Sequence, residues 1–147
     1  MAGDLILAFA MPVRVYYQDT DAAGVVFHAT YLDFMERARV EWLRSQGFEP
    51  QELARRFRLL FIVRHLDIAY LKPAVLDDLL AVTAAVQKLG RAQVTLVQEV
   101  LRGSEALVRA SVNLACVATG SLKPMPVPEE VLASFADETQ LPLEATA

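Results

Sequence analysis

Two aspartates, a glycine and a histidine stand close together near the start of the chain. They are Asp19, Asp21, Gly24 and His28, in the string DTDAAGVVFH. A carboxylate can attack a carbonyl carbon or take a proton from water, and an imidazole changes charge near neutral pH. Gly24 would let the backbone approach a substrate without a Cβ in the way. We therefore expect hydrolytic or acid–base chemistry at this loop.

The sequence argues against several other chemistries. Cys116 stands among Leu114, Val117 and Ala118, where a buried, inert thiol is the ordinary interpretation. The nucleophile motif G-x-S-x-G of serine hydrolases is absent from the sequence. Two histidines and one cysteine form no cluster with metal-ligand spacing, so we expect no metal site.

Composition narrows the class of protein further. The 147 residues are 54% hydrophobic and 22% charged, which predicts one folded domain spanning residues 1–147. The net charge of −4 gives no attraction for nucleic acid. The single cysteine favours a reducing compartment, and the opening MAGDLILAFAMPV has no Lys or Arg and is too short to span a bilayer. We expect a cytoplasmic protein without membrane insertion.

The loop leads into a long amphipathic helix, predicted over about residues 30–46. Six apolar residues recur every three or four positions, while charged residues take the positions between them. Thr30 and Asp33 have the spacing of a capping box, and Gly47 suits a left-handed helix end. The apolar face consists of Tyr31, Phe34, Met35, Ala38, Trp42 and Leu43.

The remaining elements are predicted to be strands. Alternation predicts a first strand over residues 13–18, and four later runs cover residues 59–70, 79–88, 92–101 and 106–118. Short gaps containing glycine separate the last three runs, so these should form an antiparallel meander. One long helix beside five antiparallel strands predicts an α+β hotdog fold, in which the sheet wraps around the helix. The core should span about residues 13–124, with a short terminal helix over about 128–137.

The string YYQDTDAAGVVFHATYLDFMERAR resembles the signature of small hotdog acyl-CoA thioesterases, a family that includes 4-hydroxybenzoyl-CoA thioesterase and the Tol–Pal-associated (YbgC-like) enzymes. The similarity is greatest to the Tol–Pal-associated branch and extends through LDIAYLKPAVLDDLL. In the 4-hydroxybenzoyl-CoA enzyme an aromatic residue matches the position of His28, which speaks against aryl specificity here.

The resemblance implies roles for individual residues. Asp21 matches the catalytic carboxylate, as general base or nucleophile, and Tyr17 and His28 match residues associated with activity. The backbone N–H of His28 or its neighbour matches the donor that polarises the thioester carbonyl. By resemblance, Lys88 and Arg91 lie near the nucleotide end of coenzyme A, although a solvated hairpin explains these two residues equally well. Three residues at the loop and the helix start are further candidates for substrate contact: Gly24, Val25 and Tyr31.

The family also implies an assembly and a set of partners. Two subunits join their sheets, so that Asp21 of one faces the helix end of the other, and dimers often pair into tetramers. The mean hydropathy of +0.32 also favours an oligomer. Coenzyme A would be part of the substrate, with no separate cofactor. An acyl carrier protein and an envelope-assembly protein remain open as partners.

Two other functions are compatible with these residues. The first is a hotdog dehydratase or hydratase acting on acyl carriers, although the spacing of Asp21 and His28 and the lack of an Asp-x-Asn-Pro-like segment disfavour it. The second is a non-catalytic acyl-CoA-binding module, which an intact Asp21 disfavours. Hydrolysis followed with a thiol-reactive dye separates the three.

Overall fold

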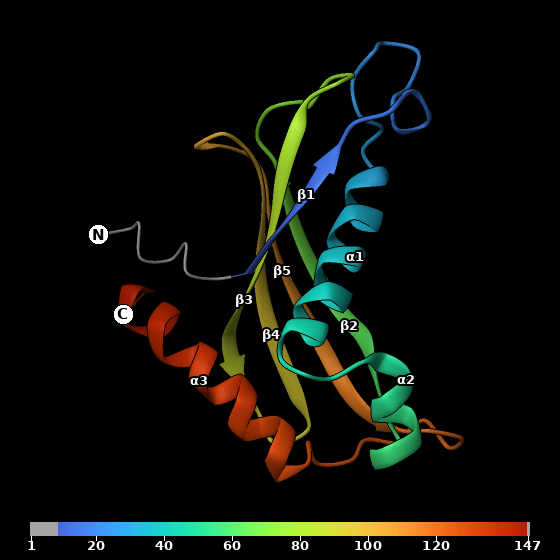
Figure 1. Ribbon diagram of the computed structural model, residues 1–147, viewed down its shortest axis with the longest axis vertical. Helices are drawn as coiled ribbons and strands as arrows, with labels where there is room; N and C mark the ends of the chain where they lie inside the picture. The colour runs from blue at the N-terminus through green and yellow to red at the C-terminus, as the bar shows by residue number, and fades with distance from the viewer. Residues whose placement is uncertain (1–8, 147) are drawn as a thin grey trace.

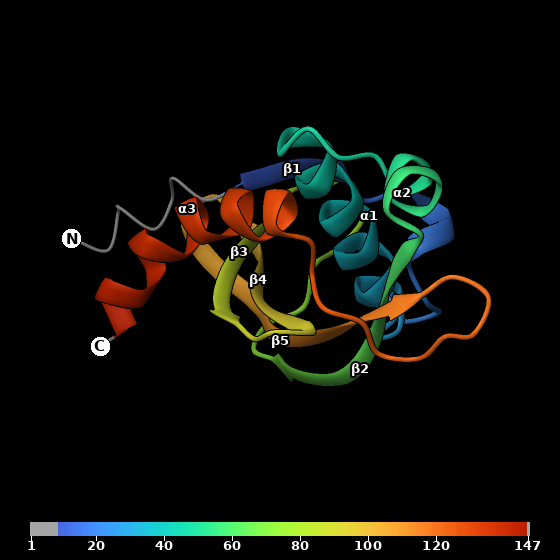
Figure 2. The ribbon, with the colours of Figure 1, turned by 90° about the horizontal axis from the view of Figure 1, so that it is seen from below.

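The computed structural model describes residues 9–146, with side chains described through residue 137. Figures 1 and 2 show a curved antiparallel sheet with two helices, α1 and α3, on one of its faces. The sheet order is β1-β3-β4-β5-β2, so β3, β4 and β5 form the predicted meander. The strands are β1 (Phe9–Arg14), β2 (Leu59–Tyr70), β3 (Leu79–Leu89), β4 (Gln93–Arg102) and β5 (Glu105–Ala118).

Helix α1 (Thr30–Ser45) forms the centre of the core, as the apolar periodicity predicted. Its buried residues are the six named from the sequence, and the sheet curves around them (Figure 2). The hotdog arrangement is therefore confirmed. Gly47, at φ +91°, follows the helix in the left-handed conformation expected of it.

The predicted capping box at Thr30 is wrong. The residue at the N-cap is Ala29, and no side chain caps the helix. The Thr30 amide already donates to the carbonyl of Phe27 at 2.8 Å, so the chain turns before Thr30 and places it inside the first turn. The start of α1 consequently has no side-chain acceptor for its leading N–H groups.

The first strand lies earlier than predicted. β1 covers Phe9–Arg14, and Tyr17–Asp19 forms a 3-10 turn instead of continuing the strand. The cause is Asp19, whose carboxylate accepts the Tyr16 N–H at 2.8 Å while its own N–H donates to the Tyr16 carbonyl at 3.0 Å. The alternation of residue types in the sequence thus continues to Gln18, although the strand itself ends at Arg14. The four later strands agree with prediction to within one residue at each end.

The C-terminal helix is longer than predicted. α3 runs over Glu129–Thr146 instead of ending near Asp137. Val131 and Phe135 are fully buried, and the Phe135 ring lies 4.8 Å from that of Trp42 in α1 and 5.9 Å from that of Phe61 in β2. This packing fixes the first turns of α3 on the core, from which the helix can propagate.

Between α1 and β2 the chain forms α2 (Pro50–Glu52) and a π-helical turn over Leu53–Phe57. In residues 9–146 no helix is both long enough and apolar enough to cross a membrane.

Candidate active site

The candidate loop is a small hairpin at the N-terminal end of α1 (Figure 1). Thr20 and Val26 form an antiparallel bridge, and the Asp21 amide donates to the Val25 carbonyl at 2.9 Å. Gly24 closes the tip with φ +86°, and its N–H donates to the Asp21 carbonyl at 3.0 Å. A residue with a Cβ would be strained in this backbone conformation, so Gly24 is required by the turn itself.

The structure separates the two aspartates into different roles. The Asp19 side chain is buried, with 9% of the residue exposed, and holds the 3-10 turn through the Tyr16 amide. Asp21 is exposed at the hairpin tip, where Oδ1 accepts the Ala23 N–H at 2.8 Å. Among the residues with described side chains, 9–137, its Oδ2 has no hydrogen-bond partner, so this oxygen is free to act on a substrate or on water.

Backbone donors are available where the loop enters α1. The amides of Thr30 and Leu32 are occupied by the carbonyls of Phe27 and Ala29. The amides of His28 and Ala29, by contrast, have no acceptor anywhere in the described part of the chain. Unpaired N–H groups at the positive end of a helix dipole are suited to stabilising an oxyanion.

A hollow of about 250 Å³ lies beside these donors. His28 is exposed at its edge, and its ring lies tilted against that of Phe27, with centroids 4.5 Å apart and an angle of 53° between the planes. Tyr31 is nearly fully buried and accepts the Ala74 amide at 3.0 Å, and burial raises the pKa of its hydroxyl. The wall of the hollow is formed by Val26, His28, Tyr31, Tyr70, Leu71, Lys72 and Pro73.

The hairpin is bonded to residues 71–78, the segment between β2 and β3. The Val26 amide donates to the Ala74 carbonyl at 2.9 Å, and Val25 forms a bridge with Val75. The Val75 amide in turn donates to the Asp78 carboxylate at 2.9 Å. The loop that carries Asp21 is therefore tied to this segment by main-chain bonds.

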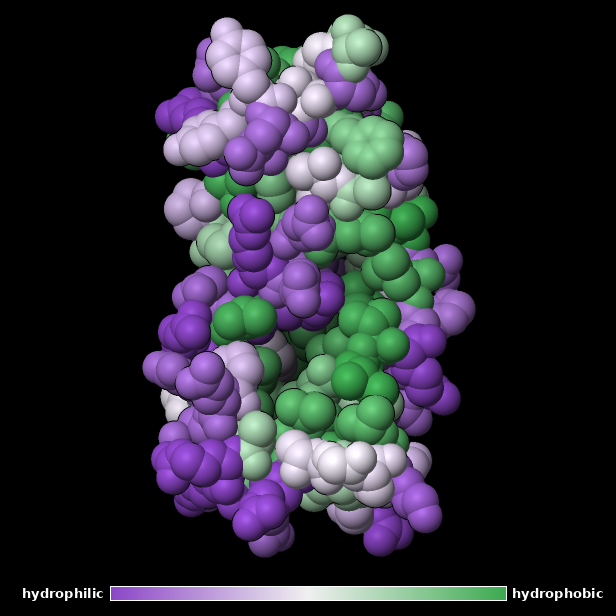
Figure 3. Space-filling model, turned by 90° about the vertical axis from the view of Figure 1, so that its right-hand side faces the viewer, coloured by the Kyte–Doolittle hydropathy of each residue, from purple (hydrophilic) through white to green (hydrophobic). Residues whose placement is uncertain are grey.

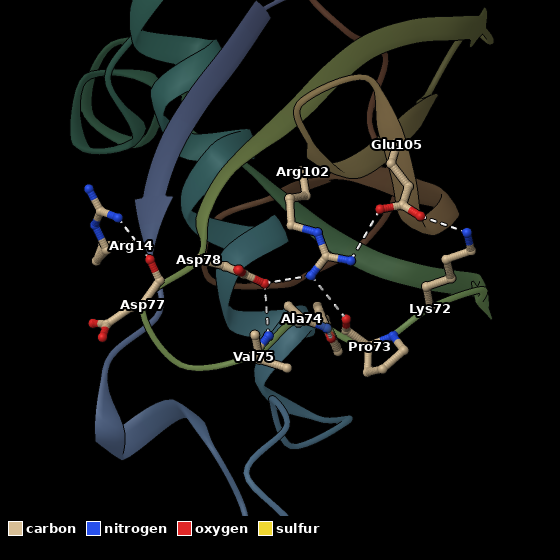
Figure 4. A network of polar contacts seen from close by, with 10 residues as sticks. Arg14, Lys72, Pro73, Ala74, Val75, Asp77, Asp78, Arg102 and Glu105 are labelled. Carbon is tan, nitrogen blue, oxygen red and sulfur yellow. Dashed lines mark hydrogen bonds and ion pairs between the residues drawn. The ribbon is translucent and has the colours of Figure 1, made fainter.

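A polar network fixes the same segment to β4 and β5 (Figure 4). Arg102 lies between two carboxylates, donating to Asp78 at 2.7 Å and to Glu105 at 3.1 Å, and Lys72 donates to Glu105 at 2.6 Å. The hydrogen bonds to Asp78 and Glu105 raise the pKa of Arg102, and those from Lys72 and Arg102 lower the pKa of Glu105. The support beneath the loop is thus ionic and joins the segment between β2 and β3 to two strands, β4 and β5.

The structure does not bring all of the predicted site residues together. Tyr17 is 82% exposed, and among the residues with described side chains, 9–137, no hydrogen bond or ion pair joins it or His28 to Asp21. Lys88 and Arg91 flank the β3–β4 turn. Arg14, just before the loop, pairs with Leu79 at the other end of β3. The length of β3, roughly 30 Å, therefore separates this turn from Asp21.

Sequence reasoning missed Tyr70, whose hydroxyl donates to the His28 carbonyl at 2.9 Å. The two residues are 42 positions apart, and the sequence offered only the position of Tyr70 at a strand end before Lys72-Pro73. The network of Arg102 and Asp78 was missed for the same reason, since its members are far apart in the sequence.

Comparison with known proteins shows which family this chain belongs to. A sequence profile of the thioesterase superfamily matches residues 23–109. The acyl-CoA thioesterase YbgC of Haemophilus influenzae is 47% identical over 127 residues, covering 86% of this chain and 93% of that protein. The acyl-CoA thioester hydrolase YbgC of Escherichia coli O6:H1 is 39% identical, with 86% and 95% covered. The crystal structure of a probable thioesterase from Bartonella henselae superposes with a TM-score of 0.79 at 39% identity, covering 82% of this chain and 99% of that one.

Proposed function

The chain belongs to the thioesterase superfamily, and on that premise we propose that it hydrolyses acyl-CoA thioesters to a free acid and coenzyme A. The observation that carries the proposal is that the loop holds both a free carboxylate oxygen, on Asp21, and amides without acceptors at the start of α1. The two YbgC relatives are named for this activity on acyl-CoA. A cytoplasmic location, where acyl-CoA is available, is part of the same proposal.

In the proposed reaction Asp21 works on one side of the thioester and the helix end on the other. As a general base, Asp21 takes a proton from water while the water oxygen adds to the carbonyl carbon. As a nucleophile, it adds directly and forms an anhydride that water then cleaves. In both cases the N–H groups of His28 and Ala29 stabilise the oxyanion, the C–S bond breaks, and the coenzyme A thiolate leaves and is protonated.

We assign supporting roles to the other candidates. His28 hydrogen-bonds water or the thioester from the edge of the hollow, and Tyr17 orients Asp21 once substrate or a second subunit covers the loop. Gly24 and Val25 let the backbone approach the substrate, and Tyr31 walls the acyl group. No cofactor is required, because coenzyme A enters as part of the substrate.

We propose that a second copy of the chain pairs along β2. The two edges of the sheet differ, since β1 is short and carries Pro12, which cannot donate to a ladder, whereas β2 is twelve residues long. Three apolar side chains of β2, Leu60, Ile62 and Val63, are exposed. An unpaired edge of this length with apolar side chains is a template for another strand.

The surface beside β2 supports the same interface. Figure 3 shows apolar side chains gathered around a hollow on the face that carries α1, α2 and β2. This groove has a volume of about 360 Å³. Apolar surface of this kind is typical of a subunit contact. Its walls include Val40, Leu43, Leu53, Leu59, Ile62 and Leu114.

A two-fold axis across β2 would also account for the positions of Lys88 and Arg91. Antiparallel pairing of the two β2 strands puts the β3–β4 turn of one subunit at the same end of the joint sheet as the Asp21 loop of the other. We propose that these cations reach the phosphates of coenzyme A bound by the partner, whose own Asp21 loop and α1 N-terminus lie together at that end of the joint sheet. Further pairing of dimers would give a homotetramer.

The test is a panel of acyl-CoA substrates of increasing chain length, with released thiol measured by a thiol-reactive dye. We expect turnover on at least one substrate, whereas binding without thiol release would indicate a non-catalytic module. Ile62→Lys should dissociate the dimer in light scattering and abolish turnover. Leu122→Lys, which changes an exposed leucine in the turn after β5, is the matched control. Full specific activity in a monomeric Ile62→Lys protein would refute the shared site.

A further inference from the structure

The hydroxyl of Tyr70 joins the end of β2 to the residue that precedes α1. Its Oη donates to the His28 carbonyl at 2.9 Å, and its ring meets that of His28 edge-on at 6.3 Å between centroids. The same ring also packs on Tyr31, with centroids 5.7 Å apart. Tyr70 thus contacts His28 through both its ring and its hydroxyl.

The backbone that carries Tyr70 is firmly anchored in the sheet. Tyr70 pairs with Val108 in β5, and the next two amides, of Leu71 and Lys72, both donate to the carbonyl of Leu107. A side chain with only two rotatable bonds on such a strand end has little freedom. The position of the hydroxyl is therefore set by the sheet.

Residues 27–29, which Tyr70 contacts, are otherwise held by main-chain bonds, such as the one from the Phe27 amide to the Asp19 carbonyl at 3.0 Å. Helix α1 lacks a side-chain cap, and among the described residues Tyr70 is the only side chain that donates to the backbone of residues 27–29. A peptide bond is planar and trans, so fixing the His28 carbonyl also fixes the direction of the Ala29 N–H, which points the opposite way. The His28 N–H belongs to the preceding peptide, whose Phe27 carbonyl accepts the Thr30 amide at 2.8 Å.

These contacts carry an inference that rests on the proposed function. We infer that Tyr70 is a positioning residue for oxyanion stabilisation, because its hydroxyl holds the His28 carbonyl and thereby orients the unpaired N–H group of Ala29. Oxyanion stabilisation depends on donors that are already oriented before reaction. Tyr70 acts through His28 and Ala29 and does not itself exchange a proton with the substrate.

Tyr70→Phe removes only the hydroxyl and keeps the ring contacts. We expect kcat to fall about tenfold with KM changed by less than about twofold, because complete loss of an oxyanion donor costs about 10²–10³ in kcat and a loosened donor costs less. Tyr16→Phe is the control, since the Tyr16 ring is 62% exposed and lies outside this contact. Both variants should keep the melting temperature of the wild type to within a few degrees.

A second measurement needs no substrate. The chain has two histidines, His28 and His65, so protein labelled with [1-13C]histidine gives two carbonyl signals in NMR. In Tyr70→Phe the His28 carbonyl signal should move upfield because it loses its donor, while the His65 signal stays in place. Tyr16→Phe should move neither signal.

The outcomes separate the inference from the proposed function. A moved His28 signal together with the loss in kcat supports the positioning role. An unmoved signal, or a moved signal with wild-type kcat, overturns it while the thioesterase proposal stands. A wild-type protein that hydrolyses no acyl-CoA overturns the proposed function, and the positioning role falls with it.

Discussion

Replacing Asp21 with Asn is the most direct test of the proposed chemistry. The amide is close in size to the carboxylate and retains an oxygen that can accept the Ala23 N–H, now bonded at 2.8 Å. It cannot attack the thioester as a carboxylate does, and it cannot take a proton from water. The substitution therefore removes the reactive group and keeps the turn.

The structure sets the expected magnitudes. Asp21 is exposed and forms no ion pair within the described residues, so the free energy of unfolding should change by less than about 0.5 kcal/mol. A positioned acid–base group contributes about 10²–10⁴ to the rate, or roughly 3–5 kcal/mol of activation free energy. Activity should thus fall by about two orders of magnitude or more in a protein of normal stability.

The assay is thiol release from the best acyl-CoA substrate, with urea unfolding of the same samples. Asp19→Asn is the matched control, because Asp19 lies two positions away but only accepts the Tyr16 N–H, which an amide oxygen can also do. This control should lose some stability and keep most of its kcat. Near-wild-type turnover by Asp21→Asn, or an equal loss in Asp19→Asn, would refute the assignment of the chemistry to Asp21.

Three further predictions address the site, the core and the ion network. His28→Ala should lose less kcat than Asp21→Asn, since the backbone N–H remains, and an equal loss measured in the same assay would make the imidazole essential. Phe135→Ala should cost about 3–5 kcal/mol in urea unfolding because it opens a cavity beside Trp42, and a loss below about 1 kcal/mol would contradict the docking of α3. Lys72 and Arg102 lower the pKa of Glu105, so the stability that Glu105 contributes is complete above its ordinary pKa of 4.5 and lost as the pH falls through the lowered value. The melting temperature of the wild type should therefore exceed that of Glu105→Gln by a small margin at about pH 6, and this margin should shrink as the pH falls below 4.5. A margin that stays constant as the solution is acidified would contradict this account.

Local patterns in the sequence were sufficient for most of the fold. The six residues of the apolar face of α1 were all identified, because helical periodicity records which side of a helix is buried. The last four strands were placed to within one residue by alternation and by glycine-containing turns. Errors arose at ends, where Asp19 turns the chain out of β1 and where packing of Phe135 supports a longer α3.

In the candidate site, too, some features follow from the sequence and others only from the tertiary structure. The sequence by itself placed a loop containing Gly24 directly before α1, since turn-forming residues and helix periodicity are properties of neighbouring residues. Only the tertiary structure decided that Asp19 is buried and Asp21 free, and that Tyr70 reaches His28 across 42 positions. Contacts of that kind depend on sheet order and on how far the sheet curls around α1, and no local pattern of residues encodes either.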